Sequence, residues 1–213
     1  MDDVLDLLGG CVEALAVSAA SRAKRNAAAD RLIPPPSPGT PLLVSLALAV
    51  EHSGVYLGGG RVAELQDDGR VVAVSLTDFV NGSPGAFPAV RTGTRIFAAC
   101  DAKTRKPIGS SQSLRSAKAA VAGRVRLPYD LVRNNCHRFV AACAQGADWD
   151  GRGFGRMAID AAASVGWLER VLAKRLNGGK AIAWCAVARS RERFNYGLTG
   201  EKIARLRLEG KIK

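Results

Sequence analysis

The sequence predicts an α+β domain in which an antiparallel β-meander packs against a helix that carries a cysteine. Two β-rich runs within 52–66 flank the triplet Gly58–Gly60, which is a strong hairpin signal. A turn leads from there into a third strand at 70–76. Much later, a helical pattern begins at Asn134 or Asn135 and ends at Gly146. The meander and the late helix together predict this fold class.

The other elements follow from local patterns. Apolar residues recur at helical spacing over 3–28, and the proline-rich stretch 33–41 cannot continue a helix. Further strands are expected at 42–50, which is continuously apolar, and at 94–100, after a glycine- and proline-rich loop at 79–93. Downstream we expect a helix at 114–122 capped by Ser113, a helical region at 154–176, and one or two short basic helices at the end.

These elements suggest four parts of the chain. We expect an N-terminal helix (1–32), a proline-rich linker (33–41), a catalytic domain (42–148) and a basic helical C-terminal extension (149–213).

Composition narrows the class of protein. The chain has 213 residues, of which 47% are hydrophobic, so a sizeable core is expected. Its five cysteines form no CxxC pair, which argues against a zinc ribbon or a disulfide framework and favours a reducing compartment. No signal peptide and no 18-residue apolar run is evident, so we expect a cytoplasmic protein or one exported without a leader. The alanine, glycine and arginine content suggests a bacterial or phage genome.

The net charge of +12 favours anionic partners. Much of it lies in 169–213, which is suited to an anionic membrane surface. Basic residues there are not interleaved with aromatic ones, so nucleic acid is not the expected partner. The alternative is a solvated basic face without a dedicated partner.

The candidate chemistry centres on Cys136. A nucleophilic thiol needs a base, and the chain holds only two histidines, His52 and His137. A cysteine in the first turn of a helix is favoured as a thiolate by the helix dipole, and its backbone N–H can donate to an oxyanion. We therefore expect Cys136 to be the nucleophile and His52 its base. No metal site or cofactor is expected.

The hairpin supplies a third group. A three-residue loop at Gly58–Gly60 places residue 57 opposite 61 and Gly54 opposite Glu64. His52 and Glu64 are then diagonal neighbours on one face, and Gly54 leaves room between them. A carboxylate there can hold one imidazole nitrogen and leave the other free to take a proton.

Each residue also has a structural interpretation. Cys136 suits a core position on its helix, His52 a structural or exposed position on a strand, and Glu64 an ordinary strand carboxylate. His137 points about 100° away from Cys136 on a helix, so we interpret it as a supporting or surface residue. The remaining cysteines are expected to be packing residues: Cys11, Cys100, Cys143 and Cys185.

Two runs, HSGVYLGGGRVAEL and SLRSAKAAVAGRVRLPYDLVRNNCHRFV, together resemble the lecithin:retinol acyltransferase-like proteins, which are circularly permuted members of the NlpC-type papain-like superfamily. The resemblance covers roughly 40–146 and implies that fold, with Cys136, His52 and Glu64 as the catalytic residues. The family usually has Asn-Cys-Glu-His-Phe where this chain has His137 and Arg138 after the cysteine. Many relatives have His at the position of Glu64.

The resemblance implies a Cys acyl-enzyme mechanism on lipid acyl esters, ending in hydrolysis or acyl transfer. The residues expected around the substrate are Tyr129, Asn135, Gly54, Tyr56 and His137. Two alternatives stay open at this point. One is a cysteine peptidase or amidase acting on peptidoglycan or isopeptide bonds, and the other is a non-catalytic binding module with a basic tail.

Overall fold

The structure of this chain is a computed structural model that describes residue 33 and residues 36–45, 51–82, 95–128, 135–149 and 165–187. The expected helix over 3–28 and the basic residues beyond 187 lie outside the described residues.

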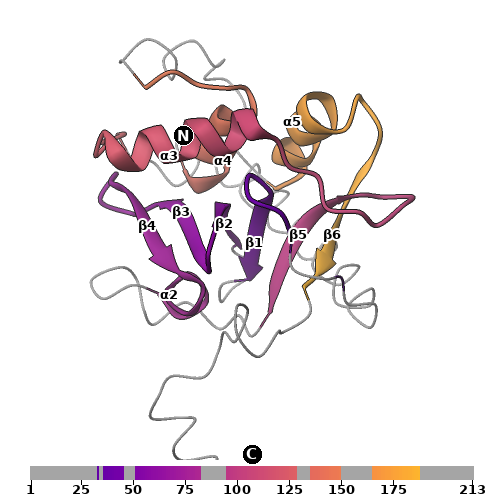
Figure 1. Ribbon diagram of the computed structural model, residues 1–213, viewed down its shortest axis with the longest axis horizontal. Coiled ribbons are helices and arrows are strands. Elements are labelled where there is room, and N and C mark those ends of the chain that lie inside the picture. The colour runs from indigo at the N-terminus through magenta and orange to yellow at the C-terminus, as the bar shows by residue number, and fades with distance from the viewer. Residues whose placement is uncertain are drawn as a thin grey trace, which may run out of the picture.

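A six-stranded sheet forms the centre of the fold, with the strand order β4-β3-β2-β1-β5-β6 (Figure 1). Every neighbouring pair in it is antiparallel. Together with the helices described below, the sheet confirms the predicted α+β class. Its strands are β1 (Pro41–Ser45), β2 (Glu51–Gly58), β3 (Arg61–Leu65), β4 (Val71–Ser75), β5 (Ile96–Asp101) and β6 (Ile182–Ala186).

The β2–β3 hairpin has the predicted register at its base, where Gly54 pairs with Glu64. Its tip differs from the expectation. Gly58 pairs with Arg61, and a register shift leaves Leu57 without a partner across the hairpin. The turn therefore contains two residues rather than three. Gly59 and the glycine after it both have positive φ, which suits the tight turns that connect twisted strands.

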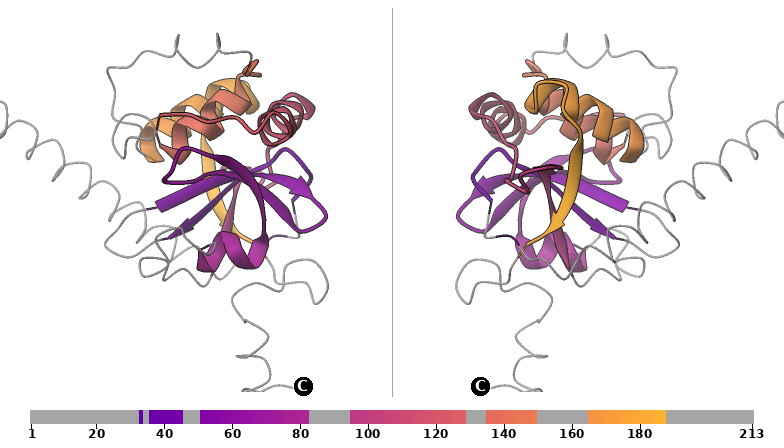
Figure 2. Two further views of the ribbon diagram at one scale, coloured as in Figure 1. Left: turned by 90° about the vertical axis from the view of Figure 1, so that its left-hand side faces the viewer. Right: turned by 90° about the vertical axis from the view of Figure 1, so that its right-hand side faces the viewer.

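Helices lie on both faces of the sheet (Figures 1 and 2). On one face are α3 (Ser111–Ala122), α4 (Cys136–Ala144) and α5 (Val165–Leu176), and on the other is the short α2 (Leu76–Asn81). Phe139 of α4 and Leu168 of α5 pack with Val55 in the core of the first face, whereas Phe79 of α2 packs with Val62 on the second. None of the described helices has the length and hydropathy needed to cross a bilayer.

Two elements were not expected from the sequence. Helix α2 occupies the start of the segment interpreted as a loop at 79–93; Ser75 caps it by accepting a hydrogen bond from the Asp78 N–H at 3.0 Å. Strand β6 lies in the segment interpreted as basic and helical, and it pairs with β5 along its whole length. The purely helical interpretation of 149–213 is therefore wrong at β6, although α5 agrees with the expected helical region.

Helix α4 has the predicted ends, with Asn135 at its N-cap and Gly146 in the left-handed region just beyond its C-cap. Helix α3 ends beside Gly123 as expected, but its N-cap is Ser110 rather than Ser113. The Ser110 hydroxyl accepts a hydrogen bond from the Ser113 N–H at 3.0 Å. The Ser113 side chain is instead buried, and its hydroxyl hydrogen-bonds to no described residue.

This difference gives a stability prediction. Ser110→Ala removes the cap and is expected to lower the free energy of unfolding by about 1 kcal/mol. Ser113→Ala is expected to leave that free energy unchanged or raise it, because it removes a buried hydroxyl that lacks a hydrogen bond. Urea denaturation measures both, with the exposed Ser111→Ala as the control. A larger loss in Ser113→Ala than in Ser110→Ala would contradict the assignment of the cap.

Candidate functional site

Cys136 is the first residue of α4, and its environment is set by the cap before it. The Asn135 side chain accepts hydrogen bonds from the backbone N–H groups of His137 at 3.0 Å and Arg138 at 3.4 Å. The N–H of Cys136 hydrogen-bonds to none of the described residues. The cap therefore satisfies the next two donors of the helix and leaves the Cys136 N–H without a hydrogen bond to a described residue.

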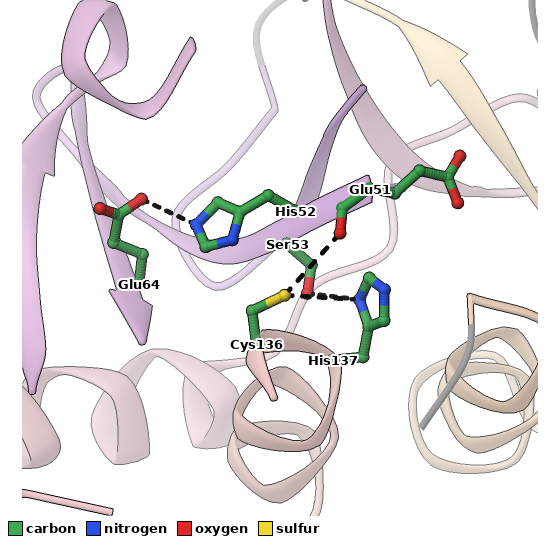
Figure 3. A network of polar contacts seen from close by, with 6 residues as sticks. All are labelled: Glu51, His52, Ser53, Glu64, Cys136 and His137. Carbon is green, nitrogen blue, oxygen red and sulfur yellow. Dashed lines mark hydrogen bonds and ion pairs between the residues drawn. The ribbon is translucent and has the colours of Figure 1, made fainter. Parts of the chain in front are cut away.

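His52 lies on β2 and is held from behind by Glu64 of β3. The His52 Nε2 atom is 2.9 Å from Glu64 Oε2, and both side chains are buried. The ring of Phe79 in α2 packs on His52, with their centroids 5.3 Å apart. Figure 3 shows that the His52 ring lies between the carboxylate and the Cys136 sulfur. The second ring nitrogen, Nδ1, is therefore available to the thiol.

A second group of contacts lies on the other side of the sulfur (Figure 3). The Sγ atom of Cys136 is 3.9 Å from His137 Nδ1 and 4.0 Å from the carbonyl oxygen of Glu51. The same His137 nitrogen is 2.9 Å from the hydroxyl of Ser53. Residues of β2 and α4 thus enclose the sulfur, which is almost completely buried.

The electrostatics favour a thiolate at Cys136 paired with an imidazolium at His52. Burial by itself would raise the pKa of Cys136, but the charges of His137 and His52 and their hydrogen bonds outweigh it and hold this pKa well below its usual value. Burial lowers the pKa of His52, yet the charge and hydrogen bond of Cys136, followed by those of Glu64, raise it to about 9. A thiolate and an imidazolium are therefore the stable forms at neutral pH.

Cys143 shows the contrast within the same helix. It is fully buried two turns beyond Cys136, and burial raises its pKa well above the usual value. Its thiol therefore stays protonated and serves as a packing group, as the sequence predicted. The difference between the two cysteines comes from the imidazoles beside Cys136, because burial acts on both in the same direction.

His137 differs from its sequence interpretation. It is buried, with 6% of its surface exposed, so the surface alternative is wrong. The rotation of about 100° per residue does separate it from Cys136 around the helix. Side chains lean towards the N-terminus of a helix, however, and this brings the ring back beside the sulfur. Sequence reasoning missed Ser53, whose only signal is its position next to His52.

The other residues predicted to lie around the substrate either have a structural role or lie outside the described residues. Gly54 pairs with Glu64, but the space above it is filled by Val62 and the ring of Phe79. The hydroxyl of Tyr56 accepts a hydrogen bond from the hairpin N–H of Gly60 at 3.3 Å, so this contact supports the turn. Tyr129 lies outside the described residues. Nowhere in the described ranges do three His, Cys, Asp or Glu side chains form a group able to hold a metal ion.

Comparison with known proteins gives one match. The family model described as lecithin retinol acyltransferase matches residues 36–148, just over half of the chain. Searches of curated proteins and of solved structures found no match. The matched segment contains the hairpin with His52 and Glu64 and the helix that begins at Cys136.

The charged pair can be tested by titration. His52 is expected to titrate near pH 9, and Cys136→Ser should lower that pKa because it removes the neighbouring thiolate charge. NMR of labelled histidine measures this directly, since the chain has only two imidazoles and His137→Gln assigns them. If His52 titrates at its ordinary value of 6.5 in the unmodified protein, the pair does not exist.

Gly54 gives a packing prediction beside the site. A Cβ atom there would lie 2.6 Å from a Val62 methyl and 2.7 Å from the Ala63 carbonyl oxygen. Gly54→Ala is therefore expected to lower the free energy of unfolding by about 1–3 kcal/mol. Gly166→Ala is the matched control, because a Cβ in that helix would make only an ordinary van der Waals contact, 3.9 Å from the Arg170 side chain, and alanine favours helix. Equal effects in the two variants would show that Gly54 is not tightly packed.

Proposed function

Because the chain belongs to the lecithin retinol acyltransferase family, we propose that it is a thiol acyl hydrolase or acyltransferase that acts on lipid acyl esters. Family membership indicates acyltransferase or hydrolase chemistry on lipids. We assign Cys136 as the nucleophile, His52 as the base and then the acid, and Glu64 as the group that orients His52. One observation carries this assignment: the imidazole beside the sulfur is held from behind by a buried carboxylate at 2.9 Å.

We also assign the domain to the circularly permuted NlpC-type papain-like fold. The support is the order of the parts along the chain, because the hairpin bearing His52 precedes the helix bearing Cys136. The antiparallel sheet packed against that helix agrees with this assignment.

The first half-reaction transfers the acyl group to sulfur. The Cys136 thiolate attacks the ester carbonyl carbon, and a C–S bond forms as negative charge moves to the carbonyl oxygen. The N–H of Cys136, which hydrogen-bonds to none of the described residues, can donate to this oxyanion. His52 then gives its proton to the departing alkoxide as the C–O bond breaks. The products are an alcohol and a thioester on Cys136.

The second half-reaction frees the enzyme. His52 is now neutral and takes a proton from water or from an acceptor alcohol or amine, which attacks the thioester carbonyl. The C–S bond breaks, the thiolate is restored, and the imidazolium is restored with it. Glu64 keeps the ring in one orientation through both halves by accepting from Nε2.

The charge of the chain supports a lipid substrate. A net charge of +12 attracts the protein to an anionic membrane surface, where acyl esters are concentrated. Each basic residue near such a surface adds about 1 kcal/mol of attraction. We therefore propose membrane contact through the basic C-terminal region.

The proposed reaction predicts a covalent intermediate. Vesicles containing anionic phospholipid are expected to give an acyl mass gain on the intact protein and to release fatty acid or acylated acceptor. Cys136→Ala should abolish both, whereas Cys143→Ala, which removes a protonated packing thiol, should retain them.

Glu64→Gln should slow turnover by roughly 10²-fold or more, because it removes the charge that holds His52. Turnover should also fall as the pH rises through about 9, where His52 loses the proton that it gives to the leaving group.

Parallel incubations decide the substrate class. Cleavage of peptidoglycan peptides or isopeptide-linked proteins, with phospholipids inert, would replace the lipid assignment by an amidase. An absence of adduct and turnover with every donor, together with ordinary thiol reactivity at Cys136, would end the enzyme assignment.

A further inference from the structure

We propose that His137 is a second catalytic imidazole of this site, positioned by Ser53, and that it shares the Cys136 thiol proton with His52. The proposal rests on the function proposed above. It assigns a role to His137, which the mechanism with His52 as the single base does not use. It concerns a buried imidazole whose ring nitrogen lies 3.9 Å from the reacting sulfur.

The two imidazoles reach the sulfur from opposite faces of one strand. Successive residues of a β-strand point to opposite sides of the sheet. His52 accordingly lies on the face covered by α2, against Phe79, while Ser53 lies on the face covered by α4 and contacts His137. The sulfur at the start of α4 lies between the imidazoles of His52 and His137 (Figure 3).

Each imidazole is held by a polar partner, as a proton acceptor must be. Glu64 holds His52 at 2.9 Å, and Ser53 holds His137 at the same distance. The partners differ in charge. The Glu64 carboxylate therefore stabilises an imidazolium strongly, whereas the Ser53 hydroxyl does so only weakly. His52 is thus the principal holder of the proton, and His137 is the secondary one.

The transfer is balanced without any further reactant. When the thiol ionises, its S–H bond breaks and an N–H bond forms on one of the two imidazoles, so the products are a thiolate and an imidazolium. In the principal form the proton is on His52, and in the secondary form it is on Nδ1 of His137. The new N–H then donates to the Ser53 hydroxyl and also faces the thiolate. During deacylation, the proton of the attacking water, alcohol or amine can go to His52 or to His137, which lie on opposite sides of β2.

The neighbouring charges define what a titration of the site reports. Apart from the two histidines, the described titratable groups on the elements around the site are Glu51 and Tyr56 of β2, Arg61 and Glu64 of β3, Asp78 of α2, and Cys136, Arg138 and Cys143 of α4. The variants below leave all of these groups in place. A change in thiol reactivity therefore reports the imidazole that was replaced.

The test is the pH dependence of alkylation by iodoacetamide, followed by mass mapping of the Cys136 peptide in the full chain. We compare the unmodified protein with His52→Gln, His137→Gln and the double variant. At a fixed pH below the ordinary cysteine pKa of about 8.5, His52→Gln should be alkylated roughly tenfold faster than the double variant. His137→Gln should shift the profile to higher pH than in the unmodified protein.

Ser53→Ala tests the positioning role. It should move the alkylation profile in the same direction as His137→Gln, and it should have no effect once His137 is already replaced. Circular dichroism and the urea midpoint show whether each variant is folded. Ser53→Ala is a conservative change that keeps both imidazoles, so it yields a decisive profile even if the double variant fails to fold.

The outcomes separate the two proposals. If His52→Gln and the double variant have the same profile, and Ser53→Ala has that of the unmodified protein, then His137 is only a packing residue and this inference fails. The acyl adduct of the unmodified protein would survive that result. If instead no adduct forms with any donor, the proposed function fails, whatever the alkylation profiles are.

Discussion

The structure depends on keeping a thiolate ionised in a place from which water is almost excluded. An unpaired ion costs several kcal/mol to bury, so a buried charge needs compensation from its neighbours. Cys136 and Glu64 are two buried anions, and the His52 imidazolium between them is one cation. The remaining negative charge lies at the N-terminus of α4, which carries roughly half a positive charge. The polar atoms of His137 and Ser53 add to the same compensation.

The rest of the fold serves this arrangement by fixing β2. This strand lies between β1 and β3 within the six-stranded order, so both of its edges are hydrogen-bonded. Helix α4 packs on one of its faces and α2 on the other. A strand held in this way keeps His52 and Ser53 at fixed positions on its two sides. The sulfur is placed independently by the Asn135 cap, which sets where α4 begins.

Local signals account for the parts that the sequence predicted. The Gly54–Glu64 register follows from a glycine-rich turn flanked by strands, and the start of α4 follows from an asparagine cap. The missed parts lack such signals. Strand β6 is a five-residue apolar run, which periodicity cannot distinguish from a piece of helix. Helix α2 is shorter than two turns, and its only signal is the Ser75 cap.

Ser53 and the burial of His137 were missed for a different reason. Both depend on α4 lying against β2, a contact between residues 84 positions apart in the chain. The sequence shows which residues lie on each face of the hairpin, but it does not show which face the helix covers. Once the helix is docked, the alternation along β2 determines that Ser53 meets His137 while His52 meets Glu64.

The acid and the second imidazole are placed as the electrostatics of a buried thiolate require. The carboxylate of Glu64 lies behind His52, 2.9 Å from its far nitrogen, and the second imidazole lies next to the sulfur. A carboxylate beside the thiolate would oppose its ionisation, whereas an imidazole there favours it. The two supports come from neighbouring strands, because Glu64 of β3 holds His52 and Ser53 of β2 holds His137.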